Sequence, residues 1–113
     1  MNTDFTEKYV LAVDVGGTVT CAVLLDSTGK VCARSHLFSS TISPEEGAIE
    51  HDPEELWVIV RKVILQLIEE QGLGPGQIAA LGLSVQRATF CLWDRKSGTP
   101  CTNFISWSDV RDR

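Results

Sequence analysis

A chain of 113 residues is long enough for one small domain and too short for two. Its composition, with 43% hydrophobic and 22% charged residues, is that of a soluble globular chain and argues against extensive disorder. The formal net charge of −5 argues against binding to nucleic acid or to an anionic membrane surface, because both would repel the chain.

Residues 1–8 contain acids and no apolar stretch, so we expect an N-terminal tail and not a secretory signal. The most apolar stretch, residues 56–68, is interrupted by Arg61, Lys62 and Gln66, which argues against a membrane span. The four cysteines are widely spaced without a C-x-x-C pair or a nearby histidine, so a zinc site is not expected. Cys91 and Cys101 could approach each other across the last hairpin, but the lack of an export signal favours reduced thiols. These features together indicate a cytoplasmic chain.

Two β-rich apolar runs, residues 9–15 and 20–26, flank Gly16 and Gly17. The chain must therefore leave one strand, turn tightly and enter the next, which predicts a strand-turn-strand unit. The backbone N–H groups of such a turn can hold phosphate oxygens, and Thr18 adds a hydroxyl donor. Asp14, at the end of the first strand, would approach phosphate through Mg²⁺. A plain hairpin with Asp14 as a turn acceptor is the alternative.

The polar cluster at residues 27–30 predicts a turn into a third strand, residues 31–38. Residues 39–51 have few apolar side chains and no sustained periodicity, which indicates an exposed loop. We expect His51, at the end of this loop, to make local hydrogen bonds.

Asp52 followed by Pro53 and two glutamates is a helix start, with an N-cap acid and a proline in the first turn. Apolar residues at three- and four-residue spacing predict a helix from Pro53 to about Gln71 that packs one face on the sheet. We expect Trp57 to belong to that packed face. Gly72 and the Gly74-Pro75 pair end the helix.

Residues 78–85 form a short, nearly continuous apolar run after this helix, which predicts a buried strand parallel to the first. The order is then β-β-β-α-β, an α/β fold. Ligands of such sheets bind beyond the strand C-termini, where Arg87 is either a donor to a polar substrate or a surface salt-bridge residue. Residues 90–93 and 103–107 indicate a closing β-hairpin.

Short segments at residues 14–18, 49–53, 86–89 and 105–109 together resemble the N-terminal part of the FGGY carbohydrate kinases, and most of all the glycerol kinases. The resemblance covers nearly all of residues 9–113. It implies an actin-like ATPase, ribonuclease H-like domain, an ATP cofactor with Mg²⁺, and a small polyol or sugar as substrate. The residues at the family's phosphate-binding positions are Asp14, Gly16, Gly17 and Thr18, and Asp14 is also the metal-linked one. Arg87 and Trp107 stand at the polyol-binding positions.

At three positions the sequence differs from typical members of the family that it resembles. Gly17 stands where a hydroxyl residue is usual, Cys21 where glycerol kinases often have arginine, and Ala88 where they have a glutamate that accepts from glycerol. The family's catalytic aspartate lies in a later segment, so we expect residues 9–113 to be a partial N-terminal domain, truncated before the catalytic segment and second lobe. Such a fragment is expected to be inactive alone and prone to self-association. A non-catalytic binding module or pseudokinase is the alternative.

Overall fold

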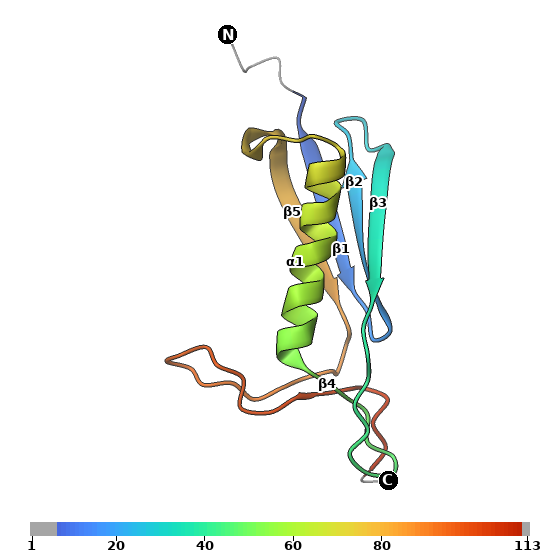
Figure 1. Ribbon diagram of the computed structural model, residues 1–113, viewed down its shortest axis with the longest axis vertical. Helices are drawn as coiled ribbons and strands as arrows, with labels where there is room; N and C mark the ends of the chain where they lie inside the picture. Colours follow the sequence, from blue (N-terminus) through green and yellow to red (C-terminus); the bar gives the residue numbers. More distant parts are fainter. Residues whose placement is uncertain (1–6, 112–113) are drawn as a thin grey trace.

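The computed structural model describes residues 7–111 and contains a four-stranded sheet with one long helix on one of its faces (Figure 1). The strands follow the order β3-β2-β1-β5, in which β1 pairs antiparallel with β2 and parallel with β5. Their bounds are β1 (Tyr9–Val15), β2 (Val19–Leu25), β3 (Val31–Phe38) and β5 (Ile78–Val85). The predicted β-β-β-α-β order and the parallel placement of the last strand are confirmed.

The turn between β1 and β2 is tight and depends on glycine. The N–H of Gly16 donates to the carbonyl of Val19 at 3.1 Å. A Cβ at Gly16 would lie 2.5 Å from that same carbonyl oxygen, a contact that side-chain carbons do not make. The turn therefore closes one residue earlier than predicted, and β2 begins at Val19 instead of Thr20.

The helix α1 (Pro53–Glu70) begins and ends as its sequence predicts. The Asp52 carboxylate caps it by accepting from the N–H of Glu54 at 3.0 Å, and Gly72 lies beyond its end with a φ of 63°. A short 3-10 turn, Pro75–Gln77, then leads into β5. The core between helix and sheet consists of buried aliphatic residues: Leu11, Val13, Ala22, Leu24, Val63 and Leu67.

α1 lies over β2 and β3 more than over β5, and this placement overturns two expectations. Trp57 is 58% exposed and stacks under the guanidinium of Arg61, 5.8 Å from the ring centroid, instead of packing in the core. β5 is a largely exposed edge strand, with Leu83 at 61% and Val85 at 62% exposure, and not the buried strand predicted. Leu81, Leu83 and Val85 pair with Leu11, Val13 and Val15, so they lie on the same face of the sheet as α1 and are exposed because α1 does not extend over β5.

Beyond the sheet, two segments far apart in sequence pair to form an extension at one end of the molecule (Figure 1). β4 (Glu50–His51) pairs antiparallel with β6 (Phe104–Ile105). Residues 39–51 are thus not an exposed loop throughout, since His51 is 1% exposed. Both of its ring nitrogens are buried without a hydrogen-bond partner among residues 7–111, contrary to the expected local hydrogen bonds. The pairing of β4 with β6 encloses the imidazole ring of His51.

The predicted hairpin over residues 90–107 is present, though it is held by isolated bridges more than by long strands. Phe90 bridges Ile105, and Trp93 bridges Pro100. Ile105 therefore pairs on both sides, with Phe90 and with Glu50 of β4. The extension gives the molecule an elongated shape of 59 × 31 × 20 Å, with a radius of gyration of 17.1 Å against about 13 Å for a compact chain of this length.

A partly buried ion-pair network stabilises this extension. Arg111 donates to the carboxylate of Asp109 and, at 2.6 Å, to that of Glu50, while Asp109 also accepts from the N–H of Ile49 at 2.8 Å. The guanidinium of Arg111 holds the pKa of Asp109 well below its usual range. The pKa of Glu50 is lowered by hydrogen bonds from two side chains, of which Asn103 has the larger effect and Arg111 the smaller. The network thereby joins residues 49–50 to the segment that carries Trp107.

Candidate functional site

The predicted phosphate turn and the predicted substrate residues lie at the same end of the sheet. β1 and β5 run in parallel and end side by side, with Val15 paired to Val85. Each strand therefore delivers its next residues to a common edge, as the C-terminal ends of parallel strands do. A Cβ at Gly17 would sit 3.2 Å from Oε1 of Gln86, so the two loops are in close contact there.

The residue that follows β3 forms hydrogen bonds to the glycine turn. Ser39, which follows β3, donates from its N–H to the carbonyl of Thr18 at 2.8 Å and from its hydroxyl to the carbonyl of Gly17 at 3.3 Å. The carbonyls of the turn are thus directed toward β3. Within residues 7–111 the N–H groups of Gly17 and Thr18 have no hydrogen-bond partner. The turn therefore presents donors of the kind that hold phosphate oxygens.

Asp14 is exposed at the end of β1, on the opposite face of the sheet from the buried Leu11 and Val13. It pairs across the sheet with Cys21 on one side and Ser84 on the other, and it lines a cavity of about 300 Å³ with them. Residues 7–111 contain no group of three or more side chains able to hold a metal ion. A Mg²⁺ at Asp14 would therefore complete its shell with phosphate oxygens and water, which is how this ion usually binds.

Two hydrogen bonds connect Trp107 to Gln86, which lies against the glycine turn. The hydroxyl of Thr89 donates to Oε1 of Gln86 at 3.2 Å and accepts from the N–H of Trp107 at 3.1 Å. Gln86 in turn contacts Gly17. Sequence reasoning did not single out these two linking residues. The indication available was their place in the same short segment as Arg87, directly after a strand C-terminus.

Arg87, Ala88 and Trp107 line one cavity of about 420 Å³. Both predicted substrate residues thus meet in one place, although they are 20 residues apart in sequence. Ala88 has a φ of 59°, a left-handed conformation uncommon outside glycine, and this bend turns the chain between β5 and the hairpin. Trp107 is 62% exposed, so its ring forms an open wall of the cavity.

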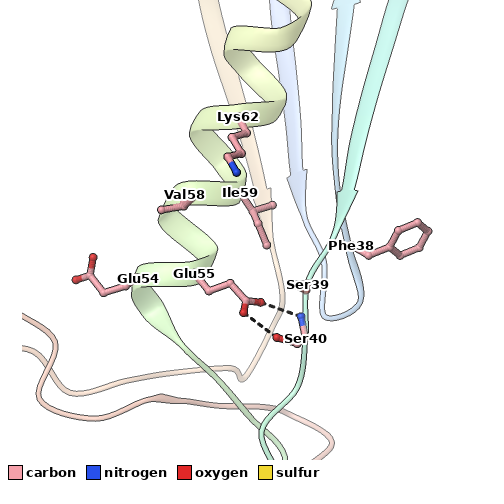
Figure 2. A pocket seen from close by; sticks show the side chains of 8 residues that line it. All are labelled: Phe38, Ser39, Ser40, Glu54, Glu55, Val58, Ile59 and Lys62. Carbon is pink, nitrogen blue, oxygen red and sulfur yellow. Dashed lines mark hydrogen bonds between the residues drawn. The ribbon is translucent and has the colours of Figure 1, made fainter.

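A further cavity, of about 640 Å³, lies elsewhere, between the end of β3 and the start of α1 (Figure 2). Figure 2 shows the Glu55 carboxylate reaching Ser40, from which it accepts at the N–H (2.8 Å) and the hydroxyl (2.7 Å). These hydrogen bonds lower the pKa of Glu55. No predicted site residue lines this cavity. Its polar contacts attach the loop after β3 to α1, so their role is structural.

Comparison with known proteins gives the class to which this fold and site belong. Residues 9–113 match the N-terminal domain of the FGGY family of carbohydrate kinases. The chain is 36% identical over 107 residues to glycerol kinase 5 of Xenopus laevis, covering 95% of this chain and 22% of that protein. It is 39% identical over 103 residues to glycerol kinase of Corynebacterium glutamicum, covering 91% and 20%.

The solved structures agree. Gluconate kinase of Lactobacillus acidophilus superposes with a TM-score of 0.83 at 31% identity, over 92% of this chain and 20% of that one. The chain therefore belongs to the FGGY family of carbohydrate kinases, and its sheet and helix are part of the actin-like ATPase fold. It spans about a fifth of the length of these relatives. No helix in residues 7–111 is long and apolar enough to cross a membrane.

Proposed function

We propose that this chain supplies the phosphate-binding turn and one wall of the acceptor pocket of a cytoplasmic, ATP-dependent polyol or sugar kinase. The observation that supports this most is the contact between Gly17 and Gln86, because it places the glycine turn against the loop that forms the pocket. Phosphoryl transfer depends on holding donor and acceptor in line, so a kinase needs these two sites side by side.

In this proposal the free N–H groups of Gly17 and Thr18 hold phosphate oxygens of ATP, and Gly16 allows the tight turn. Asp14 binds Mg²⁺ through its water shell, since a carboxylate does not contact phosphate favourably without a cation. When bound, the ATP–Mg²⁺ complex supplies the transferable phosphoryl group and neutralises its charge. The residues of this chain position it.

Arg87 and Trp107 bind the acceptor. The guanidinium donates hydrogen bonds to oxygen atoms of the substrate, and the exposed indole packs against its carbon chain. Relatives named for glycerol and for gluconate show that the family's acceptors range from a neutral polyol to a polyol acid. The proposed substrate class is accordingly a small polyhydroxy compound.

We propose further that residues 9–113 form a partial N-terminal domain of a longer kinase, whose remaining part supplies the catalytic base. The relatives are about five times as long as this chain. Among the described residues, the side chains that line the acceptor pocket cannot take a proton from an acceptor hydroxyl, since Arg87 and Trp107 are donors only and Ala88 is apolar. The 113-residue chain alone is then catalytically silent.

The test joins residues 9–111 to the rest of the Corynebacterium glutamicum glycerol kinase, in place of the segment they match, and measures ADP release with glycerol, gluconate and pentuloses. We expect substrate-stimulated release that Asp14→Asn lowers at least about tenfold, because the metal-linked carboxylate is lost. Glu69→Gln, which removes an exposed carboxylate from the far end of α1, is the matched control.

The second candidate is a binding module that keeps the fold without transferring phosphoryl groups. Ala88 favours it, because the described lining of the pocket then has no side-chain acceptor to orient a hydroxyl for reaction. A folded chimera that binds ATP and shows no substrate-dependent ADP release would establish this alternative in place of the kinase.

A further inference from the structure

We infer that the acceptor taken by this pocket is an anionic polyol, a hydroxyl-bearing carbon chain with a terminal carboxylate or phosphate group. The inference rests on the proposed function for the identity of the site and deepens it by naming the substrate class. It is carried by the hydrogen-bonding character of the three side chains that line the pocket and by the charge around them.

Among residues 7–111, the side chains that line the pocket include hydrogen-bond donors and no acceptor. Arg87 and the indole N–H of Trp107 only donate, and Ala88 does neither. A neutral polyol must find an acceptor for each hydroxyl proton it withdraws from water, since an unpaired polar group is costly. A carboxylate or phosphate needs donors alone. The pocket wall therefore matches an anionic group better than a hydroxyl.

The Thr89 hydroxyl, a side-chain acceptor in the same segment as Arg87, is already engaged. Thr89 gives its hydroxyl proton to Gln86 and accepts from the N–H of Trp107, so its position is fixed by contacts within the chain. It lies behind the lining and does not form part of it. The link that holds Trp107 in place thus uses the hydroxyl that a polyol would otherwise contact.

The pairing of charged side chains near the pocket also favours an anionic ligand. The carboxylates of the adjoining segment, Asp109 and Glu50, are both paired with Arg111. Arg87, in contrast, is exposed and has no ion pair among the described residues. Both carboxylates are therefore engaged by Arg111 and not by Arg87, which lines the cavity without an ion pair within residues 7–111. An arginine in this state binds carboxylate or phosphate through paired, charge-assisted hydrogen bonds.

The test uses the 113-residue chain and matched ligand pairs that differ only at one end: glycerol with glycerate, and sorbitol with gluconate. The Trp107 indole N–H is followed by nuclear magnetic resonance during titration and assigned with Trp107→Phe. We expect glycerate and gluconate to bind about tenfold more tightly than their neutral partners. Glycerol phosphate, as a further arm, distinguishes a phosphate from a carboxylate as the preferred anionic group.

Substitutions distinguish binding in the pocket from a general effect of the chain's charge on anion binding. Arg87→Met is expected to abolish the preference for the anion, and Arg87→Lys to keep part of it, because lysine retains charge without the planar fork. Arg95→Met, the same substitution in the exposed tip of the hairpin, is expected to leave it unchanged. Ala88→Gln adds an acceptor to the wall and is expected to improve glycerol binding by about fivefold.

Equal or tighter binding of the neutral polyols, or no Trp107 shift with any anion, overturns the inference. Acetate binding as tightly as glycerate also overturns it, because the hydroxyls would then play no part. Its failure is distinct from that of the proposed function. A chimera that phosphorylates glycerol and rejects glycerate refutes the inference alone, whereas glycerate binding without phosphoryl transfer refutes the kinase alone.

Discussion

The side-chain oxygen of Thr89 accepts a hydrogen bond of 3.1 Å from the backbone N–H of Trp107, which lies 18 positions further along the chain. This bond holds the exposed indole at the mouth of the pocket, where few other contacts restrain it. Through Gln86 the same hydroxyl is connected to the glycine turn. The two loops that form the proposed site are thus linked by side chains of a single short segment.

Replacing Thr89 with Val removes this hydroxyl while keeping the side-chain shape. We expect glycerate to bind about fivefold more weakly, which corresponds to roughly 1 kcal/mol for one hydrogen bond, because Trp107 is no longer held. The Trp107 indole titration measures this change. Thr89→Ser keeps the hydroxyl and should bind like the original chain. Unchanged affinity in Thr89→Val would show that the bond does not position the ring.

Gly16→Ala tests the closure of the turn between β1 and β2. The added Cβ would lie 2.5 Å from the carbonyl oxygen of Val19, so the turn must open or shift. We expect a loss of about 1–3 kcal/mol in the free energy of unfolding, the usual cost of forcing an atom into a packed site. Urea denaturation measures it. Gly76→Ala meets nothing within 4 Å and should change stability by less than about 0.5 kcal/mol; equal losses in both variants would contradict the explanation.

The extension should lose its order in acid. The pKa values of Asp109 and Glu50 are lowered in the folded state, chiefly by hydrogen bonds from Arg111 and Asn103 respectively. Their stabilisation is therefore complete above the unfolded values of about 4 and is lost as the pH falls through the lowered folded values. Hydrogen exchange at the Ile49 amide, corrected for its intrinsic pH dependence, reports this loss.

Arg111→Met provides the control for that pH dependence. Without the guanidinium, the folded pKa of Asp109 rises, so protection of the Ile49 amide should begin to fall at a higher pH than in the original chain. An acid transition that stays at the same pH in this variant would mean that other carboxylates govern the extension.

Self-association of the 113-residue chain is expected through the open face of β5. Leu83 and Val85 are more than 60% exposed on an edge strand, an arrangement that favours pairing between molecules. Leu83→Lys should reduce association in sedimentation velocity experiments, because it places a charge on this row. Gln66→Lys adds the same charge to the exposed side of α1 and should have little effect. A monomer at all concentrations in the original chain would refute the expectation.

Local sequence patterns predicted the four strands of the main sheet and α1, but not β4. The strands of the sheet follow from β-rich runs, and α1 follows from an N-cap at Asp52, a proline and a glycine stop. Each of these features acts between residues a few positions apart, so it can be read without knowledge of the fold. The glycine requirement at residue 16 is of the same kind, because the clash it avoids is with Val19.

The tertiary structure decided which apolar residues are buried and which polar ones meet. Trp57 and Ile59 both suit a helix, yet only Ile59 is buried, because α1 lies toward β2 and β3. His51 is enclosed because residues 104–105 pair with its strand. The site itself arises where Gly17 contacts Gln86, 69 residues away, and Thr89 contacts Trp107. Such contacts depend on the register and parallel alignment of β1 with β5, which no local pattern specifies.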